Sequence, residues 1–511
     1  MELLLNAAQM KQYDRDTIDT IGIPSMVLME RAALCFAEEL ERHAFDLSSV
    51  LILCGSGNNG GDGFAIARLL SEKGVAVRTA FVGKDSSMTE ETALQRRICK
   101  NYGIKICTDF QAFEYTTIVD AIFGIGLSRP VEGRYAELIT WINEQKAAKA
   151  AVDIPSGISA DSGKILGTAV KADLTVTFAC RKIGQILYPG AEYCGEVICR
   201  NIGILPERLP VGNISADVFT YEKNDLHNLI QRTPYSNKGT YGKVLLIAGS
   251  QGMSGAACLA ATAAYRSGCG LVRVFTPDCN RQILQTVLPE AIVTAYSEQE
   301  IPLTLLRQSM EWADVIGIGP GLGTAQTAQR ILETVLRESK KPMVIDADGL
   351  NLLSVQPALL HFAKAPVILT PHIGEMMRLT ERQKSDITED IIFAASSYAK
   401  KYGIICVLKD ARTVVSDGQK NYLNTSGNHG MAVGGSGDVL TGIICGLLAQ
   451  GMEPFHGAAL GVYLHGLAGD LARQKLSAYS MIAGDILNQL GQVLKEAEKM
   501  PCGISGGIYE T

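Results

Sequence analysis

The sequence lacks the features of several protein classes. Its 511 residues carry a net charge of -6, and the 20% of residues that are charged form no basic stripe of the kind that binds DNA or RNA. The thirteen cysteines are scattered, without C-x-x-C pairs or the spacing of a zinc site. We therefore expect no nucleic-acid partner, no structural zinc and no disulfide framework, but the reduced thiols of a cytoplasmic protein.

Long apolar runs are also missing. The stretch VLTGIICGLLAQG, from Val439, is broken by glycines and is shorter than the ~20 residues of a membrane-spanning helix. The first residues, MELLLNAAQMKQYDRD, become charged after a few apolar positions, which fits neither a signal peptide nor an anchor. We expect no membrane association.

Apolar strand-like runs alternate with helix-like segments along the chain. This alternation predicts parallel sheets flanked by helices, an α/β fold class. A first series of runs covers residues 50–54, 75–82, 117–124, 149–155 and 174–179, and a second covers 243–250, 271–277, 314–321, 343–349, 367–371 and 405–410.

A domain boundary is predicted between the two series. Residues 204–226 are richer in proline and polar residues and have no helical period, so we place the boundary near residues 215–222. The predicted domains are residues 1–215 and 222–500. The last residues, CGISGGIYET, are glycine-rich and predict a loose tail.

The stretch CGSGNNGGDG, Cys54–Gly63, lies between a predicted strand and a predicted helix. Its glycines and the backbone N–H groups of a helix start favour an anionic ligand. Asn58, Asn59 and Asp62 add polar side chains that such a turn does not need. They either hold a polar ligand, or they adopt turn conformations while Asp62 caps the helix.

Other predicted strand ends favour the ligand. Asp120 ends one strand, the glycine-rich loop 124–130 follows, and Asp153 and Ser156 follow the next strand. Since the carboxyl ends of neighbouring parallel strands face one crevice, these groups are expected to meet there. Oxygen atoms of Asn59, Asp120 and Ser156 suit a hard monovalent cation.

Three motifs in order, GNNGGDG, DAIFGIGLSRP and VDIPSG, resemble the N-terminal YjeF domain, the NAD(P)H-hydrate epimerase, over about residues 1–215. The resemblance implies a Rossmann-like three-layer sandwich, potassium bound by Asn59, Asp120 and Ser156, and Asp153 as the acid/base of epimerisation. It also implies that a hydrated nicotinamide nucleotide contacts Asn58, Asn59, Gly60, Gly61, Asp62, Gly124, Ile125, Gly126, Leu127, Ser128, Arg129, Pro130 and Asp153.

The second half contains GNHGMAVGGSGDVLTGIICGLL, from Gly427, in which glycines precede an apolar helix. Such a helix start can stabilise a transferring phosphoryl group, while Asp438 beside it takes the proton of an attacking hydroxyl. The simpler alternative is that Asp438 is an N-cap.

Five further motifs, KGTYGKVLLIAGS, GIGPGLG, DADGLN, TPHIGE and LKDART, follow successive predicted strands. With the helix start, they resemble the ADP- or ATP-dependent NAD(P)H-hydrate dehydratase of the ribokinase-like superfamily over about residues 222–500. The resemblance implies an adenine nucleotide with magnesium, held by Lys409, Asp410, Ala411, Arg412, Thr413 and Gly437, and hydrate contacts at Ala256, Gly321, His372 and Asp438. Taken alone, His372 is a structural histidine.

Together the halves predict a bifunctional repair enzyme, expected to be a homo-oligomer. It would epimerise R and S forms of NADHX and NADPHX, and dehydrate the S form with ADP or ATP, releasing AMP and phosphate when ADP is the donor. Two alternatives stay open: the second half as a kinase of a small hydroxylated metabolite, and the first as a nucleotide-sensing or protein-binding module.

Overall fold

The computed structural model describes residues 1–206, 217–229, 232–297 and 303–499. It divides into two compact units, one within Glu2–Val218 and the other within Phe219–Thr511. Part of the predicted boundary segment, residues 207–216, and the predicted tail, residues 502–511, lie outside the described residues. No helix in the described ranges has both the length and the apolar character needed to cross a membrane.

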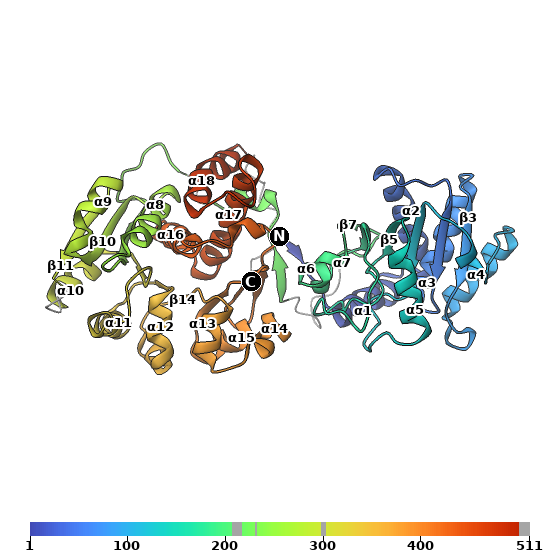
Figure 1. The fold of residues 1–511 in the computed structure, drawn as a ribbon, viewed down its shortest axis with the longest axis horizontal. Helices are drawn as coiled ribbons and strands as arrows, with labels where there is room; N and C mark the ends of the chain where they lie inside the picture. Colours follow the sequence, from blue (N-terminus) through green and yellow to red (C-terminus); the bar gives the residue numbers. More distant parts are fainter. Residues whose placement is uncertain (207–216, 230–231, 298–302, 500–511) are drawn as a thin grey trace. The chain divides into compact units, whose positions relative to one another are not determined.

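The first unit contains a parallel sheet with strand order β3-β2-β4-β5-β6-β7 (Figure 1). Its strands are β2 (Val50–Cys54), β3 (Val77–Phe81), β4 (Thr117–Ala121), β5 (Ala148–Val152), β6 (Leu174–Phe178) and β7 (Glu196–Arg200). The five predicted strands are confirmed. Sequence reasoning missed β7, because its partly exposed residues form no continuous apolar run.

The strand order reverses between β2 and β4, and such a switch point opens a crevice at the carboxyl ends of the strands. Both faces of the sheet are covered by helices. Val50 and Ile52 pack with α2 and α3, whereas Leu51 and Leu53 pack with α5, so the predicted three-layer sandwich is confirmed. The unit begins with β1 (Glu2–Leu3), and its helices are α1 (Ala7–Asp16), α2 (Ser25–Arg42), α3 (Asn58–Glu72), α4 (Glu90–Asn101), α5 (Arg134–Glu144), α6 (Ile183–Ile186) and α7 (Gly190–Tyr193).

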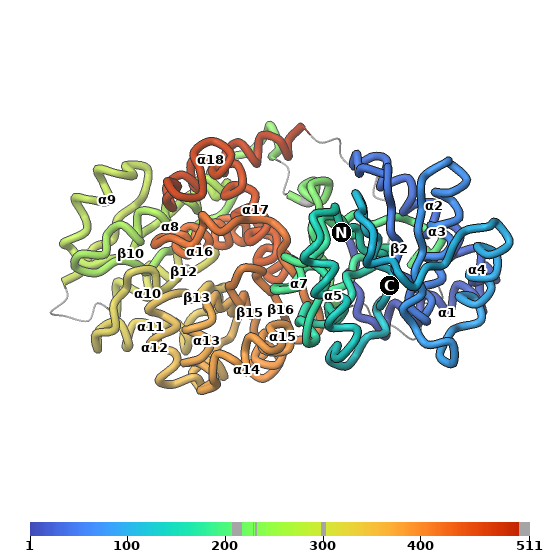
Figure 2. The backbone as a smooth tube through the Cα atoms, turned by 45° about the vertical axis from the view of Figure 1, so that its right-hand side comes forward, coloured from blue at the N-terminus to red at the C-terminus, as the bar shows by residue number. Residues whose placement is uncertain are grey.

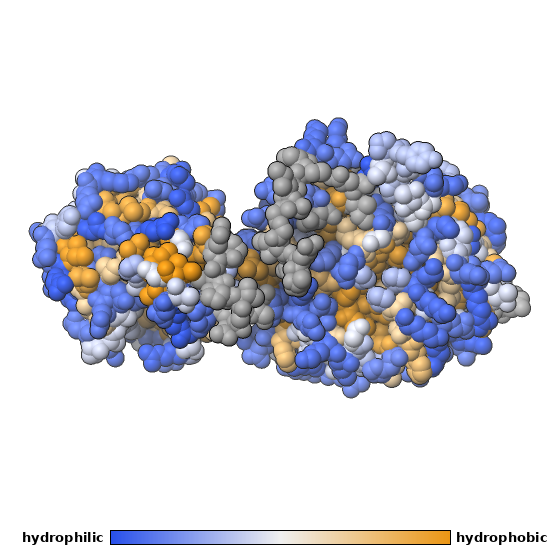
Figure 3. Space-filling model, turned by 180° about the vertical axis from the view of Figure 1, so that it is seen from behind, coloured by the Kyte–Doolittle hydropathy of each residue, from blue (hydrophilic) through white to orange (hydrophobic). Residues whose placement is uncertain are grey.

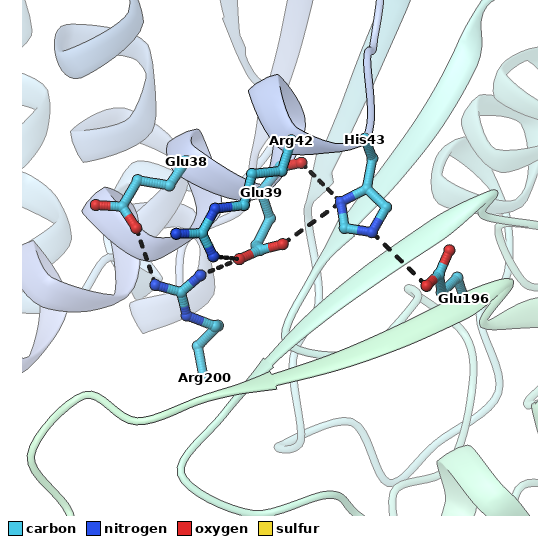
Figure 4. A network of polar contacts seen from close by, with 6 residues as sticks. All are labelled: Glu38, Glu39, Arg42, His43, Glu196 and Arg200. Atoms are coloured by element: carbon cyan, nitrogen blue, oxygen red, sulfur yellow. Dashed lines mark hydrogen bonds and ion pairs between the residues drawn. The ribbon is translucent and has the colours of Figure 1, made fainter.

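Charged side chains connect the end of α2 to the edge strand β7 (Figure 4). Glu39 is buried and accepts hydrogen bonds from Arg42 and from Arg200 of β7. His43 lies between two carboxylates, with Nδ1 3.4 Å from Glu39 Oε2 and Nε2 3.7 Å from Glu196 Oε1. Because Glu39 is removed from water, these partners are needed to offset its desolvation.

The second unit contains a larger sheet, in which β8-β17-β16-β15-β14-β13-β12-β9-β10-β11 are successive neighbours. These are β8 (Val218–Thr220), β9 (Lys243–Ile247), β10 (Leu271–Pro277), β11 (Ile292–Tyr296), β12 (Val315–Ile318), β13 (Met343–Ile345), β14 (Val367–Leu369), β15 (Ile405–Leu408), β16 (Val414–Ser416) and β17 (Asn421–Leu423). The six predicted strands of this half are confirmed and pair in parallel. The hairpin β16–β17 is antiparallel and was missed, since strands of three residues carry no readable period.

Helices α8, α16, α17 and α18 cover one face of this sheet, while α10 to α13 lie on the other side (Figures 1 and 2). The helices are α8 (Ser254–Arg266), α9 (Arg281–Val287), α10 (Leu303–Trp312), α11 (Gln326–Glu338), α12 (Asp348–Val355), α13 (Ile373–Thr380), α14 (Lys384–Glu389), α15 (Ile391–Tyr402), α16 (Ser436–Ala449), α17 (Pro454–Lys475) and α18 (Ala483–Glu498). Val244, Leu246 and Val274 of the sheet pack against the layer formed by α8, α16, α17 and α18.

Helices α8 and α16 approach almost to backbone contact. A Cβ atom placed on Gly442 would lie 2.2 Å from the carbonyl oxygen of Ala260 and 2.7 Å from the Cβ of Ala263. Only glycine permits this spacing. Because α16 begins in the glycine-rich segment that precedes Asp438, the α8–α16 contact positions that segment.

Hydrophilic side chains cover much of the visible face of each unit, and apolar side chains form smaller areas between them (Figure 3). Among the larger exposed apolar residues are Val27 and Leu34 on α2 and Ile283 and Val287 on α9. The distribution agrees with the composition of 47% hydrophobic and 20% charged residues.

Replacing Gly442 tests this close packing. We expect Gly442→Ala to lower the free energy of unfolding of the second unit by about 1–3 kcal/mol, because the new methyl group overpacks the contact with Ala260. In contrast, Gly491→Ala on α18, where a Cβ would meet nothing within 4 Å, should stabilise by roughly 0.5–1 kcal/mol. Denaturant unfolding would measure both, and equal stability of the two variants would contradict the packing argument.

Candidate active sites

A cavity of about 1180 Å³ lies at the switch point of the first unit. This volume exceeds the roughly 300–1,000 Å³ of an ordinary small-molecule pocket, so the cavity has room for an extended ligand. It is lined by Met10, Lys11, Asp14, Ser25, Leu28, Met29, Ala32, residues 55–59, Asp62, Lys84, Ser87, Thr89, residues 122–132, Tyr135, Asp153, Phe178, Lys182, Ile202 and Ile204.

Most predicted hydrate contacts line this cavity: Asn58, Asn59, Asp62, the loop 124–130 and Asp153. Gly60 and Gly61 are not among the lining residues. They lie buried in α3, where a Cβ on Gly60 would be 2.0 Å from the Gly55 carbonyl oxygen. These two glycines therefore let the helix approach its neighbours.

The predicted turn is shorter than the sequence suggested. Helix α3 begins at Asn58, so the two asparagines and Asp62 belong to the start of the helix. The N-cap is Gly57, which provides no side-chain hydrogen bond. The alternative that Asp62 caps the helix is therefore wrong, because its side chain is in the helix and borders the cavity.

Asp153 follows β5 and has a positive φ of 65°, a conformation that costs an ordinary residue about 1–3 kcal/mol. Its side chain is held by three donors. Oδ1 accepts from Lys182 Nζ at 2.5 Å, from Thr177 Oγ1 at 3.0 Å and from the Phe178 N–H at 3.4 Å. The carboxylate is thus fixed at the cavity wall.

Lys182 is 1% exposed, and its ammonium also donates to Thr177 Oγ1 at 2.8 Å and to the Phe178 carbonyl at 3.1 Å. Three acceptors therefore satisfy the three donors of a buried ammonium group. This pairing was missed in the sequence, where Lys182 stands in a loop without a motif.

Asp14 and Asp62 bring more negative charge to the cavity. Burial, followed by the charges of Asp153 and Asp14, raises the pKa of Asp62 well above its usual value. Burial also raises the pKa of Asp14, with contributions from Glu91 and Asp153.

Asp120 and Ser156 lie beneath the cavity and do not line it. Asp120 is 1% exposed; its Oδ1 accepts from Ser156 Oγ at 2.6 Å and its Oδ2 from the Ser156 N–H at 2.7 Å. Burial raises the pKa of Asp120 to about 6, although hydrogen bonds from Ser156 oppose the shift. Asn59 Nδ2 is buried without a hydrogen-bond partner, and its side chain lies against Gly124.

In the second unit, a buried acid–lysine pair stands at the end of β13. Lys409 Nζ donates to Asp346 Oδ1 at 2.8 Å, and Thr441 Oγ1 of α16 donates to Asp346 Oδ2 at 2.8 Å. Burial opposes the charge of Asp346, but Lys409 and the hydroxyls of Thr370 and Thr441 hold the pKa of its carboxyl below the usual value. The pair therefore stays ionised.

The start of α16 faces this pair. A Cβ on Gly437 would lie 3.2 Å from Lys409 Nζ and 3.4 Å from Asp346 Oδ2, so only glycine leaves the ammonium accessible there. The N-cap of α16 is Gly435, and Asp438 is inside the first turn, so the alternative that Asp438 is an N-cap is wrong. Burial, followed by the charge of Asp346, raises the pKa of Asp438 to about 6.

The other predicted contacts of this unit form two groups. His372 pairs with Lys409 in a β-bridge, which places it beside the acid–lysine pair. Its ring also caps α13, with Nδ1 accepting from the Glu375 N–H at 3.2 Å, as the structural interpretation of His372 anticipated. Gly321 lies against Ala256, since a Cβ on Gly321 would be 3.0 Å from that of Ala256.

Residues Lys409–Thr413 follow β15. Arg412 donates to the Thr425 carbonyl at 3.0 Å, and the Thr413 carbonyl accepts from the Asn424 N–H at 2.9 Å. Asp410 and Ala411 are exposed. The segment is therefore fixed at its end by the residues that follow β17, while its middle residues face solvent.

Two side chains of this site were missed. Asp346 ends a predicted strand in the same way as Asp120, and that position is the signal that would have found it. His465 of α17 has Nε2 3.3 Å from Ser436 Oγ, behind the start of α16, and burial lowers the pKa of His465 to about 4. No sequence pattern marks it, because α17 is apolar around its circumference.

Two family models match the chain in separate ranges. A model described as the YjeF-related protein N-terminus matches residues 25–184, and one described as NAD(P)H-hydrate dehydratase matches residues 244–492. A solved ribokinase-like superfamily protein from Enterococcus faecalis is 34% identical and superposes with a TM-score of 0.51, covering 57% of this chain and 100% of its own. The fold thus defines a class: a two-unit α/β protein with a Rossmann-like first unit and a ribokinase-like second unit.

Whole-chain relatives identify the family. The bifunctional NAD(P)H-hydrate repair enzyme of Moorella thermoacetica is 38% identical over 97% of both chains. That of Escherichia coli is 36% identical over 96% of this chain and 93% of its own. The chain belongs to the family of bifunctional NAD(P)H-hydrate repair enzymes.

Removing one member of the buried pair tests its energetics. We expect Asp346→Ala to destabilise the second unit by about 3–5 kcal/mol, because it leaves the Lys409 ammonium without its carboxylate. The double variant Asp346→Ala/Lys409→Met should recover much of this loss, since no uncompensated charge remains. Urea unfolding measures both; a single-variant loss below about 1 kcal/mol would contradict the assignment.

Proposed function

We propose that this chain repairs hydrated NADH and NADPH in two steps. The first domain, residues 1–215, interconverts the R and S forms of NADHX and NADPHX, and the second, residues 222–500, dehydrates the S form to NAD(P)H. The single observation that carries the proposal is a carboxyl group placed at a candidate site in each unit: Asp153 after β5, held by three hydrogen bonds, and Asp438 in the first turn of α16, close to the charges of Asp346 and Lys409. Family membership over 97% of the chain supports both activities.

In the epimerase site, Asp153 is the acid/base. Its clamp of Lys182, Thr177 and the Phe178 N–H holds the carboxylate at the cavity wall, where it can take a proton from the ring hydroxyl. Asn58, Asn59, Asp62 and the loop 124–130 contact the nucleotide. In this proposal Gly60 and Gly61 contribute through backbone spacing.

Potassium fits the group beneath the cavity. Asp120 is a buried carboxylate, and among the described side chains no lysine, arginine or histidine forms an ion pair with it. Ser156 Oγ and the Phe123 carbonyl lie 3.3 Å apart beside it, and the amide oxygen Oδ1 of Asn59 is the further candidate ligand. These oxygen donors suit a hard cation, which would offset the buried charge and fix the loops on either side.

In the dehydratase site, Asp438 takes the proton of the hydrate hydroxyl as the phosphoryl group arrives. The start of α16 and the Lys409 ammonium stabilise the charge on that group. Phosphate then leaves from the ring carbon, the neighbouring carbon loses a proton to solvent, and the electron pair of that C–H bond restores the double bond. Lys409–Thr413 and Gly437 hold the adenine nucleotide, and Ala256, Gly321 and His372 contact the hydrate. We propose ADP as donor, giving AMP, with ATP as the alternative.

Magnesium would accompany the nucleotide and neutralise its phosphates. Within the described parts of the chain, no group of three or more histidine, cysteine, aspartate or glutamate side chains is arranged to hold a metal ion. This fits Mg²⁺, which is usually held by one or two carboxylates together with phosphates and water. Asp348 and Asp438, whose like charges interact, are the nearest candidates.

We further propose a cytoplasmic location, which free cysteines such as Cys199 and Cys279 on the surface support. The homo-oligomer expected from the sequence stays a prediction.

The two activities should be separable. We expect Asp153→Asn to lower the rate of epimer interconversion at least about 100-fold and leave dehydration of the S form unchanged, since it removes a general base from one site only. Asp438→Asn should do the reverse. Chromatography of the epimers without nucleotide measures the first activity, and absorbance of the reduced nicotinamide formed from the pure S form measures the second. Equal loss of both activities in either variant would contradict separate sites.

Dehydration should depend on pH through Asp438. The carboxyl group accepts a proton only when it is ionised, and its pKa is raised to about 6, so activity should appear as pH rises through about 6. Below that value, kcat/KM should fall about tenfold for each pH unit. The initial rate with the pure S form, measured in a buffer series of constant ionic strength, tests this. A rate that stays flat well below pH ~5 would exclude Asp438 as the base.

A further inference from the structure

Four acidic residues line the epimerase cavity: Glu132 at the end of the loop 122–132, and three aspartates from separate elements, Asp14 from α1, Asp62 from α3 and Asp153 from the loop after β5. Their environments differ. Among the described residues, Lys182 is the cationic side chain paired with any of them, and it pairs with Asp153 alone. Cys199 of β7 also lies within electrostatic range of Asp153 and Lys182. Asp153 is therefore the cavity aspartate that is paired with a cation.

The hydrogen bonds to the Asp153 carboxylate all end on one of its two oxygen atoms. Oδ1 accepts from Lys182, Thr177 and the Phe178 N–H, while no donor of the described chain reaches Oδ2. Gln185 holds the backbone at the same position, with Nε2 2.6 Å from the Asp153 carbonyl oxygen. Oδ2 is the atom left to act as a base.

Asp62 has the opposite environment. Its carboxyl group accepts no hydrogen bond from the described residues, and the charges that act on it most are those of the acids Asp153 and Asp14. The other charged residues of the cavity lining are Lys11, Lys84, Arg129, Glu132 and Lys182. None of these described side chains forms an ion pair with Asp62. A carboxyl group among like charges, with limited access to water, favours its protonated form. One carboxyl group paired with a cation and another placed among like charges are the arrangement that separates a base from an acid.

We propose that Asp62 is the second catalytic residue of the epimerase site, acting as proton donor to the ring nitrogen while Asp153 acts as base, with Lys182 as the positioning residue that pairs with Asp153 Oδ1. This inference rests on the proposed epimerase function and names the residues that move its two protons.

Asp153 and Asp62 together can take up and supply both protons that move during epimerisation. The hydroxyl-bearing carbon of the hydrate is bonded to the ring nitrogen, so it opens as a hemiaminal does. Asp153 takes the hydroxyl proton, the carbon–oxygen bond becomes a carbonyl, and the carbon–nitrogen bond breaks. Its electron pair goes to the nitrogen, which takes the proton of Asp62. Rotation of the aldehyde presents its other face, and the reverse step returns each proton and gives the other epimer.

Asp62→Asn in the full-length protein tests the assignment. With the pure R form and no adenine nucleotide, the dehydratase site is idle and the R:S ratio reports epimerisation alone. We expect kcat/KM to fall about 100-fold and to lose the decline at high pH that deprotonation of a catalytic acid causes. The matched control is Asp19→Asn, which removes an exposed carboxylate that does not line the cavity and should change the rate less than about threefold. Asp14→Asn removes the other unpaired cavity aspartate and should keep the high-pH decline.

The outcomes are distinct. An Asp62→Asn variant with the wild-type rate and pH profile would overturn the proposal, and so would an Asp14→Asn variant that alone loses the high-pH decline. Wild-type protein that does not interconvert the epimers would instead refute the proposed epimerase function. Dehydration of the pure S form by Asp62→Asn, together with its thermal unfolding, checks that the variant folds.

Lys182→Met provides the second test. A role limited to folding would lower the rate by the same factor at every pH. If Lys182 keeps the base ionised, the low-pH limb of kcat/KM should move to higher pH by about one unit or more, and alkaline buffer should restore part of the rate. An unmoved low-pH limb would overturn the role of Lys182.

Discussion

In both units, parallel pairing of neighbouring strands brings the carboxyl ends of strands that are far apart in sequence to one edge of a sheet. In the first unit this edge collects the segments after β2, β4 and β5, and with them Asn59, Asp120 and Asp153. In the second it collects Asp346 after β13, His372 after β14 and Lys409 after β15. Chemistry at either site depends on this geometry, because none of these residues is near another in the chain.

A buried acid–lysine pair recurs at both edges. Asp153 with Lys182, and Asp346 with Lys409, remove opposite charges from water and recover the cost through hydrogen bonds to threonine hydroxyls. Such pairs contribute little to net stability, but they hold charged atoms in fixed positions. In the first unit the carboxylate is the group proposed to react. In the second, the carboxylate holds an ammonium group beside Gly437, where the phosphoryl group is proposed to bind.

Strand positions, the three-layer arrangement and the motif-bearing strand ends were predictable, because continuous apolar runs and glycine-rich turns are local signals. The prediction failed where the sequence contains a misleading local signal or none. The start of α3 at Asn58 was not foreseen, since glycines usually mark a turn and here continue into a helix packed against Gly55 and Met29. Lys182 and His465 carry no local signal. Their roles arise from burial against residues distant in sequence, which only the folded chain brings together.

The measurement that tests the account most directly is the recovery of reduced-nicotinamide absorbance from a mixture of both hydrate epimers, with the full-length protein, magnesium, potassium and ADP or ATP. The account predicts recovery of the whole mixture, because the first unit converts the R form into the S form that the second consumes. Recovery that stops at the initial S fraction, or that continues beyond it only at the rate of spontaneous interconversion, would contradict the account.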